Sequence, residues 1–243
     1  MQDLARFIDD HRQRFAGGHH DLFSFAFSKV IRRWEFLEVI HARYAFESAA
    51  FVENRRAFQA ALRQGEHQLT DEQQTAFEEG HSLGVQVHLE IESFYLFAKI
   101  LLDDLSRAIE YYFGPARGLS LDSHDDLFRN LESYAADKGL KLTDNLLSTI
   151  GALKKRISDF RDYEIAHEKS PRTMIGTMWG PDGIVRRSSG KLYPKETDRQ
   201  VESESLSELR IAISEYGSQV VDFVERNLDR TRLALEASSK PTP

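Results

Sequence analysis

The sequence predicts an all-α protein, a helical bundle with one small β-hairpin inserted after a late helix. Apolar residues recur at intervals of three and four along most of the chain, which is the period of a helix with one buried face. Residues 173–187 depart from that period, because short apolar runs flank a Gly-Pro-Asp-Gly turn there. With 243 residues, 41% of them hydrophobic, and no cysteine, the chain can bury a full core without disulfides.

Composition predicts a cytoplasmic protein that does not cross a membrane. No apolar run approaches the roughly 18 residues that a spanning helix requires, and the first twenty residues lack the apolar core of a secretion signal. The formal net charge of -7 argues against a protein that coats nucleic acid by bulk electrostatics. One segment, residues 169–195, is basic instead. It contains one acidic residue, Asp182, and six basic residues: Lys169, Arg172, Arg186, Arg187, Lys191 and Lys195.

Three helices are predicted in the first half of the chain. The first covers residues 4–15 and ends at a glycine pair, and the second covers residues 22–62. The third covers residues 70–113, because Thr70 and Gln73 have the types and spacing of a capping box. We expect this third helix to be central in the bundle, since its apolar stripe is wide: Ile91, Phe94, Phe97, Leu101, Leu105 and Tyr112.

Three more helices are predicted in the second half. Residues 125–136 form a helix that Gly139 ends. Thr143 or Asp144 can cap the next helix, whose apolar spacing continues to Phe160. The last helix covers residues 201–235.

The helix after residue 143 carries a guanidinium and an imidazole near its end. Arg161 and His167 lie six residues apart, which on an α-helix is roughly 9 Å of rise and about 120° of rotation. Side chains placed in this way would not touch, but they could bracket a phosphate. Similar Arg and His spacings recur in the chain, but here the polar Asp162 follows the Arg, and Pro171 disfavours helix just beyond the His.

The run Arg161-Asp162-Tyr163-Glu164-Ile165-Ala166-His167 resembles the Arg-to-His motif of the HEPN superfamily, the nucleotide-binding domains of higher eukaryotes and prokaryotes. The run from Glu90 to Asp103 looks like the first long core helix of that family, which precedes the motif. The resemblance covers residues 85–170, about a third of the chain.

This resemblance implies a metal-independent endoribonuclease without a cofactor. His167 would be the general acid or base at the ribose 2′-hydroxyl, because imidazole exchanges protons near neutral pH. Arg161 would stabilise the charge that grows on the phosphate, for which a guanidinium offers a fixed fork of donors. Asp162 would orient these groups. The family's usual homodimer would place Arg161 of one subunit near His167 of the other.

The implied substrate is RNA, and the implied biological setting is a toxin or phage-defence system with a neutralising partner protein. The basic residues that follow the motif are the candidate substrate-binding groups: Lys169, Arg172, Arg186 and Arg187. We expect one helical domain over residues 1–237 and a disordered tail over 238–243. Within the domain, residues 1–69 form an N-terminal extension, 70–170 the HEPN-like core, 171–200 the hairpin insertion and 201–237 the C-terminal helix.

Two other functions fit the same sequence. In the first, Arg161 and His167 are a salt-bridged helix end and a half-buried histidine, and the bundle is a catalytically inactive dimeric binding protein. In the second, the protein is a di-iron carboxylate bundle, because Glu-x-x-His occurs twice and such a site needs one more Glu from each of two other helices. The residues of that second reading are Glu78 with His81, Glu164 with His167, and the added Glu47 and Glu132.

Overall fold

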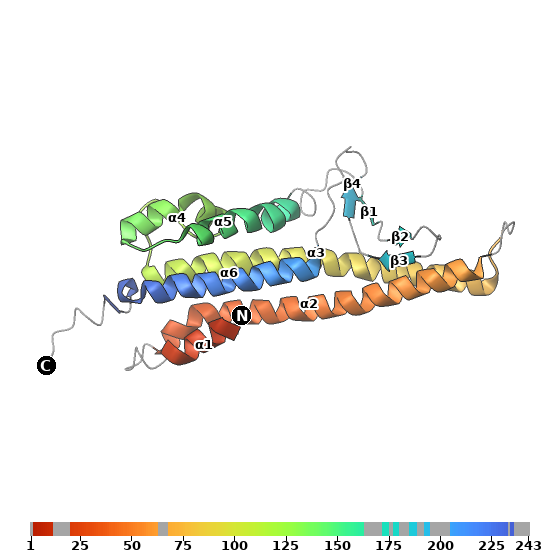
Figure 1. Ribbon diagram of the computed structural model, residues 1–243, viewed down its shortest axis with the longest axis horizontal. Helices are drawn as coiled ribbons and strands as arrows, with labels where there is room; N and C mark the ends of the chain where they lie inside the picture. Colours follow the sequence, from red (N-terminus) through yellow and green to blue (C-terminus); the bar gives the residue numbers. More distant parts are fainter. Residues whose placement is uncertain are drawn as a thin grey trace. The chain divides into compact units, whose positions relative to one another are not determined.

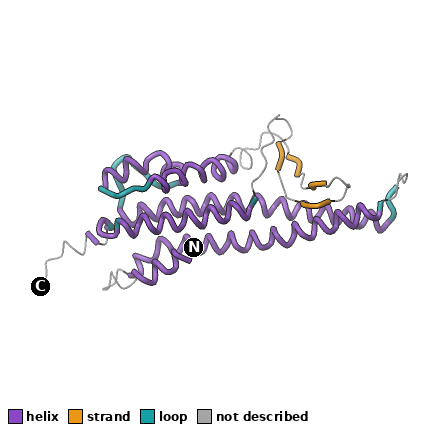
Figure 2. Tube along the Cα trace, viewed as in Figure 1, coloured by secondary structure: helices purple, strands orange, loops and turns teal. Residues whose placement is uncertain are grey.

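The protein is a helical structure, which confirms the all-α class (Figures 1 and 2). The computed structural model describes the backbone of residues 2–11, 20–62, 68–162, 172–174, 177–179, 185–188, 192–194, 205–232 and 234–235. It describes their side chains except for residues 2, 11 and 20–24 and the four strands. The predicted tail and the glycine pair at Gly17-Gly18 lie outside these ranges.

Two long helices, α2 (His20–Ala61) and α3 (Asp71–Phe113), account for much of the chain. The predicted capping box begins α3. The Thr70 N–H donates to Gln73 Oε1 at 2.8 Å, and the Gln73 N–H donates to Thr70 Oγ1 at 3.3 Å. These two bonds satisfy backbone donors that the first turn of a helix leaves without partners.

The shorter helices begin or end as local side-chain chemistry predicts at two of their boundaries. They are α1 (Gln2–His11), α4 (His124–Lys138), α5 (Asp144–Leu153) and α6 (Leu206–Arg226). Thr143 caps α5 by accepting from the Leu146 N–H. Gly139 ends α4 with φ of 64°, a left-handed conformation that strains any residue with a Cβ atom.

The chain divides into two compact units, and α2 and α3 each contribute to both. Unit 1 comprises Met1–Leu37, Tyr95–Asp162 and Leu209–Pro243, and unit 2 comprises Glu38–Phe94 and Tyr163–Glu208.

Unit 1 has an aromatic core built from four helices. Phe27 of α2 packs against Tyr112 of α3, with ring centroids 5.0 Å apart, and Phe7 of α1 meets Phe27 edge-on at 5.6 Å. Phe113 of α3 meets Phe223 of α6 at 5.7 Å. The part of the predicted apolar stripe of α3 that lies in unit 1 therefore faces this core, in which Leu101, Leu105 and Tyr112 are buried.

In unit 2, α2 and α3 approach closely at Gly80. A Cβ atom there would lie 2.4 Å from Asn54 Oδ1, so a larger residue would have to displace the Asn54 side chain. Asn54 Nδ2 donates to the Ala76 carbonyl at 3.0 Å in the same contact. A second contact pairs Arg43 with the buried carboxylate of Glu90, whose pKa burial raises.

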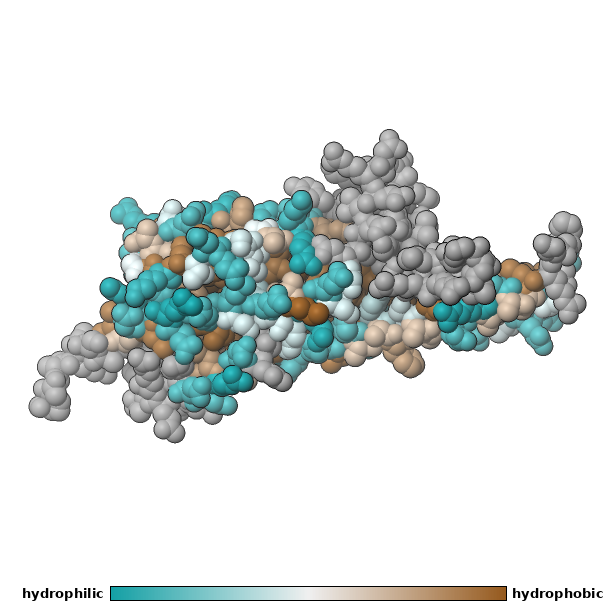
Figure 3. Space-filling view, in the orientation of Figure 1, coloured by the Kyte–Doolittle hydropathy of each residue, from teal (hydrophilic) through white to brown (hydrophobic). Residues whose placement is uncertain are grey.

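Apolar side chains also reach the surface of unit 2, most of all Phe46, which is 78% exposed. Figure 3 shows such brown and tan atoms among the teal polar ones on the visible face. Scattered exposed apolar residues are normal for a folded protein.

Four short strands follow the motif in the sequence, and all belong to unit 2. They are β1 (Arg172–Met174), β2 (Thr177–Trp179), β3 (Val185–Ser188) and β4 (Leu192–Pro194). β2 pairs antiparallel with β3, and β1 pairs antiparallel with β4. The register between β2 and β3 shifts between Met178 and Trp179.

The predicted C-terminal helix over residues 201–235 is interrupted, because α6 stops at Arg226 and helical backbone resumes at residues 232 and 234–235. A short 3₁₀ turn, η4 (Leu228–Arg230), follows it. Asn227 breaks the helix since its amide bonds to a distant part of unit 1. Its Oδ1 accepts from the Lys141 N–H at 2.8 Å, and its Nδ2 donates to the Lys141 carbonyl at 3.2 Å and to the Phe223 carbonyl at 2.8 Å.

Replacing Asn227 with alanine should lower the free energy of unfolding by about 2–3 kcal/mol, because three hydrogen bonds of about 1 kcal/mol each are lost at a buried position. Urea unfolding of wild type and variant measures this difference. Asp229→Ala is the matched control, since its side chain is 77% exposed and should change stability by less than about 0.5 kcal/mol. Equal stability of the Asn227→Ala variant and wild type would contradict the role given to Asn227.

Candidate functional site

The segment that carries Arg161 is anchored in the core of unit 1. After the Thr143 cap, apolar side chains follow one another at helical spacing and each is at most 1% exposed: Leu146, Ile150, Leu153 and Ile157. Phe160 continues this buried face and stacks on Tyr95 of α3, with ring centroids 4.4 Å apart. Arg161 therefore follows directly on a well-packed aromatic residue.

The helix changes its winding before it reaches Arg161, which the sequence did not predict. α5 ends at Leu153, and residues Lys154–Asp159 form a π-helix, η2. Arg161 and Asp162 also have π-helical backbone. A π-helix closes its hydrogen bonds between residues five apart, so it makes fewer turns over the same number of residues. The α-helical estimate for the separation of Arg161 and His167 thus does not hold at the start of the motif.

The guanidinium of Arg161 pairs with Asp162, and its Nε has no partner among the described residues. Its Nη1 donates to Asp162 Oδ1 at 2.5 Å. Its Nε is buried and makes no hydrogen bond to any residue that the structure describes. The side chain as a whole is 29% exposed, so solvent reaches part of it. An N–H group that solvent reaches can still donate to an anion, whereas the buried Nε cannot reach one without moving.

The remaining predicted site residues are only partly covered by the structure. His167 and Lys169 lie outside the described residues. The backbone of Arg172 lies in β1, and the backbones of Arg186 and Arg187 lie in β3. Their side chains are not among those described, so Arg161 and Asp162 are the predicted site residues whose contacts are known.

A network of buried and half-buried charges lies beside η2, and the sequence did not predict it. Lys99 Nζ of α3 lies 2.7 Å from Asp103 Oδ1 and 3.5 Å from Asp125 Oδ2 of α4. Lys154 Nζ of η2 lies 3.7 Å from Asp125 Oδ1 and 2.6 Å from Asp159 Oδ1. These five residues, which we name the lysine network, connect α3 and α4 to the π-helix.

His124, at the first position of α4, is fully buried next to this network. Its backbone N–H donates to Asp103 Oδ1 at 2.8 Å, and its ring meets Tyr216 of α6 edge-on at 5.7 Å. Burial, helped by the positive charge of Lys99, lowers the pKa of His124 from 6.5 to about 4. Neither ring nitrogen has a hydrogen-bond partner among the described residues, which fits a neutral imidazole in the core.

One sequence signal could have revealed part of the lysine network. Lys99 and Asp103 are four residues apart within an otherwise apolar run of α3, and charges on a buried face are expected to be paired. The burial of His124 and the partners of Lys154 carry no comparable signal, because both depend on how distant helices pack.

The described residues do not form a metal site of the kind that the di-iron alternative requires. Among them, no three His, Asp or Glu side chains are grouped so that they could hold a metal ion. Glu78 instead accepts from Gln74 Nε2 at 2.7 Å on the exposed surface of α3, and Glu132 is exposed on α4. Glu164 and His167, the second Glu-x-x-His pair, lie outside the described ranges.

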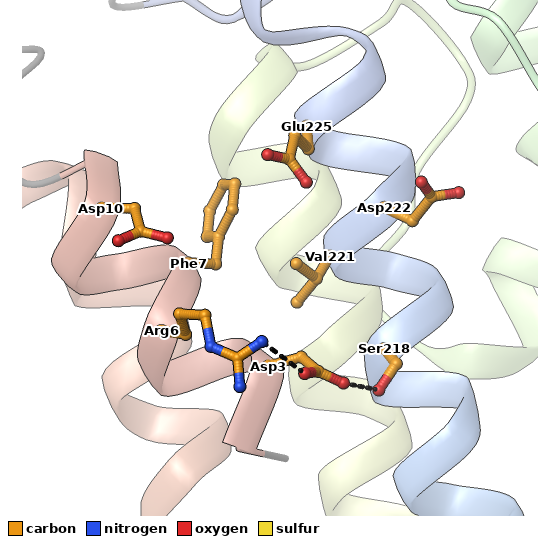
Figure 4. Close-up of a pocket in the computed structure, with 8 residues that line it drawn as sticks. All are labelled: Asp3, Arg6, Phe7, Asp10, Ser218, Val221, Asp222 and Glu225. Carbon is orange, nitrogen blue, oxygen red and sulfur yellow. Dashed lines mark hydrogen bonds and ion pairs between the residues drawn. The ribbon is translucent and has the colours of Figure 1, made fainter.

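A cleft of about 290 Å³ lies between α1 and α6 (Figure 4). Its polar contacts join Asp3 to Arg6 at 3.6 Å and to the Ser218 hydroxyl at 2.9 Å. Further carboxylates line it: Asp10, Asp222 and Glu225. This surplus of negative charge would repel a phosphate, so the cleft is a poor place for RNA.

No protein-family model matches the chain, and no curated protein or solved structure matches it. Within the part of the chain that the structure describes, no helix is both long enough and apolar enough to cross a membrane. The geometry around Arg161 is therefore the basis for assigning a function.

Proposed function

We propose that the protein is a metal-independent endoribonuclease of HEPN type, in which Arg161 and His167 act on a phosphodiester of RNA. The observation that carries this proposal is the state of Arg161. Its guanidinium follows a buried helical face, its Nη1 is held by Asp162, and its side chain is still 29% exposed. A donor fork that is oriented and partly exposed is suited to a phosphate whose negative charge increases during reaction.

The chemistry requires one proton acceptor, one proton donor and one charge partner. The ribose 2′-oxygen forms a bond to phosphorus and loses its proton, and the bond from phosphorus to the 5′-oxygen breaks as that oxygen gains a proton. His167 performs one or both proton transfers, because imidazole is the side chain that titrates near neutral pH. Arg161 stabilises the phosphorane, and Asp162 orients Arg161.

The site is completed in a homodimer. Two motif helices that cross about a two-fold axis bring Arg161 of one subunit toward His167 of the other. The hairpin insertion after the motif would then supply cations for the RNA backbone, since phosphate contacts position a nucleic acid without reading its sequence. Lys169, Arg172, Arg186 and Arg187 are the side chains proposed for that role. In the toxin or phage-defence role that the resemblance implies, a partner protein would neutralise this activity.

A catalytically inactive dimeric binding protein is the second candidate. The same ion pair of Arg161 with Asp162 favours it, because a structural salt bridge at a helix end needs no substrate. A measurement of RNA cleavage distinguishes the endoribonuclease from the inactive binding protein.

The purified protein, incubated with chelator, should cleave a mixed RNA pool and leave the DNA of the same sequence intact, because DNA lacks the attacking 2′-hydroxyl. Gel electrophoresis of labelled substrates measures both rates. Intact RNA after incubation with wild-type protein, at concentrations where it is dimeric, would reject the nuclease and support the binding protein.

A further inference from the structure

The ion pair of Lys154 with Asp159 joins residues five apart, which is a spacing that an α-helix does not allow. In an α-helix two such side chains are about 140° apart around the axis and about 7.5 Å apart along it. In a π-helix the hydrogen bonds run between residues five apart, so these residues take the neighbouring positions that residues four apart have in an α-helix. The 2.6 Å contact between Lys154 Nζ and Asp159 Oδ1 therefore depends on the π-helical winding of η2.

The pair of Lys154 with Asp159 also contacts α4 of unit 1. Asp125 of α4 lies between the two lysines of the network, 3.7 Å from Lys154 and 3.5 Å from Lys99. Lys154 Nζ additionally lies 5.9 Å from the ring centroid of Phe128, one turn further along α4. The cation of Lys154 thus has partners both within η2 and on the helix next to it.

The winding of η2 determines the direction of the residues that follow it. One residue more per hydrogen-bonded turn rotates everything downstream by about 100° relative to an uninterrupted α-helix. Phe160 meets Tyr95, and Arg161 follows with its Nε buried. With α-helical winding instead, the stacking partner of Tyr95 and the direction of Arg161 would both change.

We propose that Lys154 is a positioning residue for Arg161: its ion pairs with Asp159 and Asp125 hold η2 in the π-helical register, and that register directs the Arg161 guanidinium. The catalytic part of this inference rests on the proposed ribonuclease activity, whereas the structural part does not. Lys154 itself touches no reacting atom in this scheme. It acts through the backbone of η2.

The test compares Lys154→Met, which keeps the length of the side chain and removes its charge, with Lys155→Met, the matched control at the exposed neighbouring position. Hydrogen-bond scalar couplings in NMR spectra identify the acceptor carbonyl of each amide in residues 154–162. The nuclear Overhauser effect between the Tyr95 and Phe160 rings reports the packing. Lys154→Arg, which restores the charge, and Asp159→Asn, which weakens the pair from its other end, complete the set and remain informative if Lys154→Met fails to fold.

We expect wild type, Lys155→Met and Lys154→Arg to keep bonds to the carbonyl five residues back and the ring contact. Lys154→Met and Asp159→Asn should lose both, and their RNA cleavage rate at saturating RNA should fall about 10- to 100-fold. Retention of the five-residue bonds in Lys154→Met, or in Asp159→Asn if only that variant folds, would overturn the inference. Loss of these bonds with an unchanged cleavage rate would equally overturn the positioning role. If wild type cleaves no RNA, the proposed function fails, while the NMR comparison still decides whether Lys154 holds the register.

Discussion

Replacing Arg161 or His167 with alanine should lower the rate of RNA cleavage at least about 100-fold without unfolding the helices. The Arg161→Ala variant loses the charge partner of the transition state, and the His167→Ala variant loses the proton-transfer group. Arg161→Lys should recover little activity, because an ammonium group cannot reproduce the fork that binds Asp162 and a phosphate together. Initial rates on a labelled oligoribonucleotide, with circular dichroism as a check on helicity, measure the effect.

The matched control is His11→Ala, since His11 lies five residues after Arg6 in α1 and so has a similar spacing without the motif's context. A mixture of the two inactive variants tests the composite site. Half of the dimers then contain one chain of each variant. Each such heterodimer has one intact site out of two, so activity should return to about one quarter of the wild-type rate. If His167→Ala cleaves as fast as wild type, the site is misplaced. If the mixture stays inactive while both variants are folded and dimeric, the site does not draw on two subunits.

The stability of the protein should fall as the pH is lowered from 7 to 4, and His124 should cause a large part of the fall. Its pKa is lowered to about 4 by burial, so the folded protein keeps the imidazole neutral where the unfolded chain already binds a proton. The unfolded state therefore holds more protons between pH 6.5 and 4. The free energy of unfolding should decrease through this window by up to about 3 kcal/mol from this residue alone.

Urea unfolding of wild type and His124→Phe at several pH values measures that share, because phenylalanine keeps the ring packed on Tyr216 and removes the titrating group. The charges that face His124, on Lys99, Asp103, Asp125 and Lys154, are present in both proteins and cancel in the comparison. His81→Gln, at an exposed position of α3, is the matched control. Parallel pH profiles for wild type and His124→Phe would show that the buried histidine does not couple folding to pH.

The helix boundaries that the sequence predicted correctly are those set by neighbouring residues. The capping box at Thr70 and Gln73, the Thr143 cap and the left-handed Gly139 all involve hydrogen bonds or backbone angles within one turn. The break after α6 was not predicted because Asn227 bonds to Lys141, 86 residues away, and local helical spacing continues past it. Local chemistry thus predicts a boundary only where no distant partner competes.

The candidate site was predictable to a similar extent. The buried face that precedes Arg161 follows from apolar spacing. The pairing of Arg161 with Asp162 does not follow from their adjacency, because neighbouring side chains of a helix point in different directions. The π-helix was not predictable, because the spacing from Leu146 to Phe160 suits an α-helix equally well. One ion pair of the π-helix is made with Asp125 of α4, which approaches Lys154 only in the folded chain, so the sequence alone does not show it.

The end groups of the cleavage products test the ribonuclease proposal most directly. A labelled oligoribonucleotide is cleaved by wild-type protein with chelator present, and its products are analysed by mass spectrometry. The same oligonucleotide with one 2′-deoxynucleotide on the 5′ side of the cleaved bond is the matched substrate. We predict products ending in 2′,3′-cyclic phosphate from the first substrate and no cleavage at that bond in the second. Cleavage of the deoxy-substituted bond at the same rate, or products with a 3′-hydroxyl end, would contradict attack by the 2′-hydroxyl and with it the roles given to Arg161 and His167.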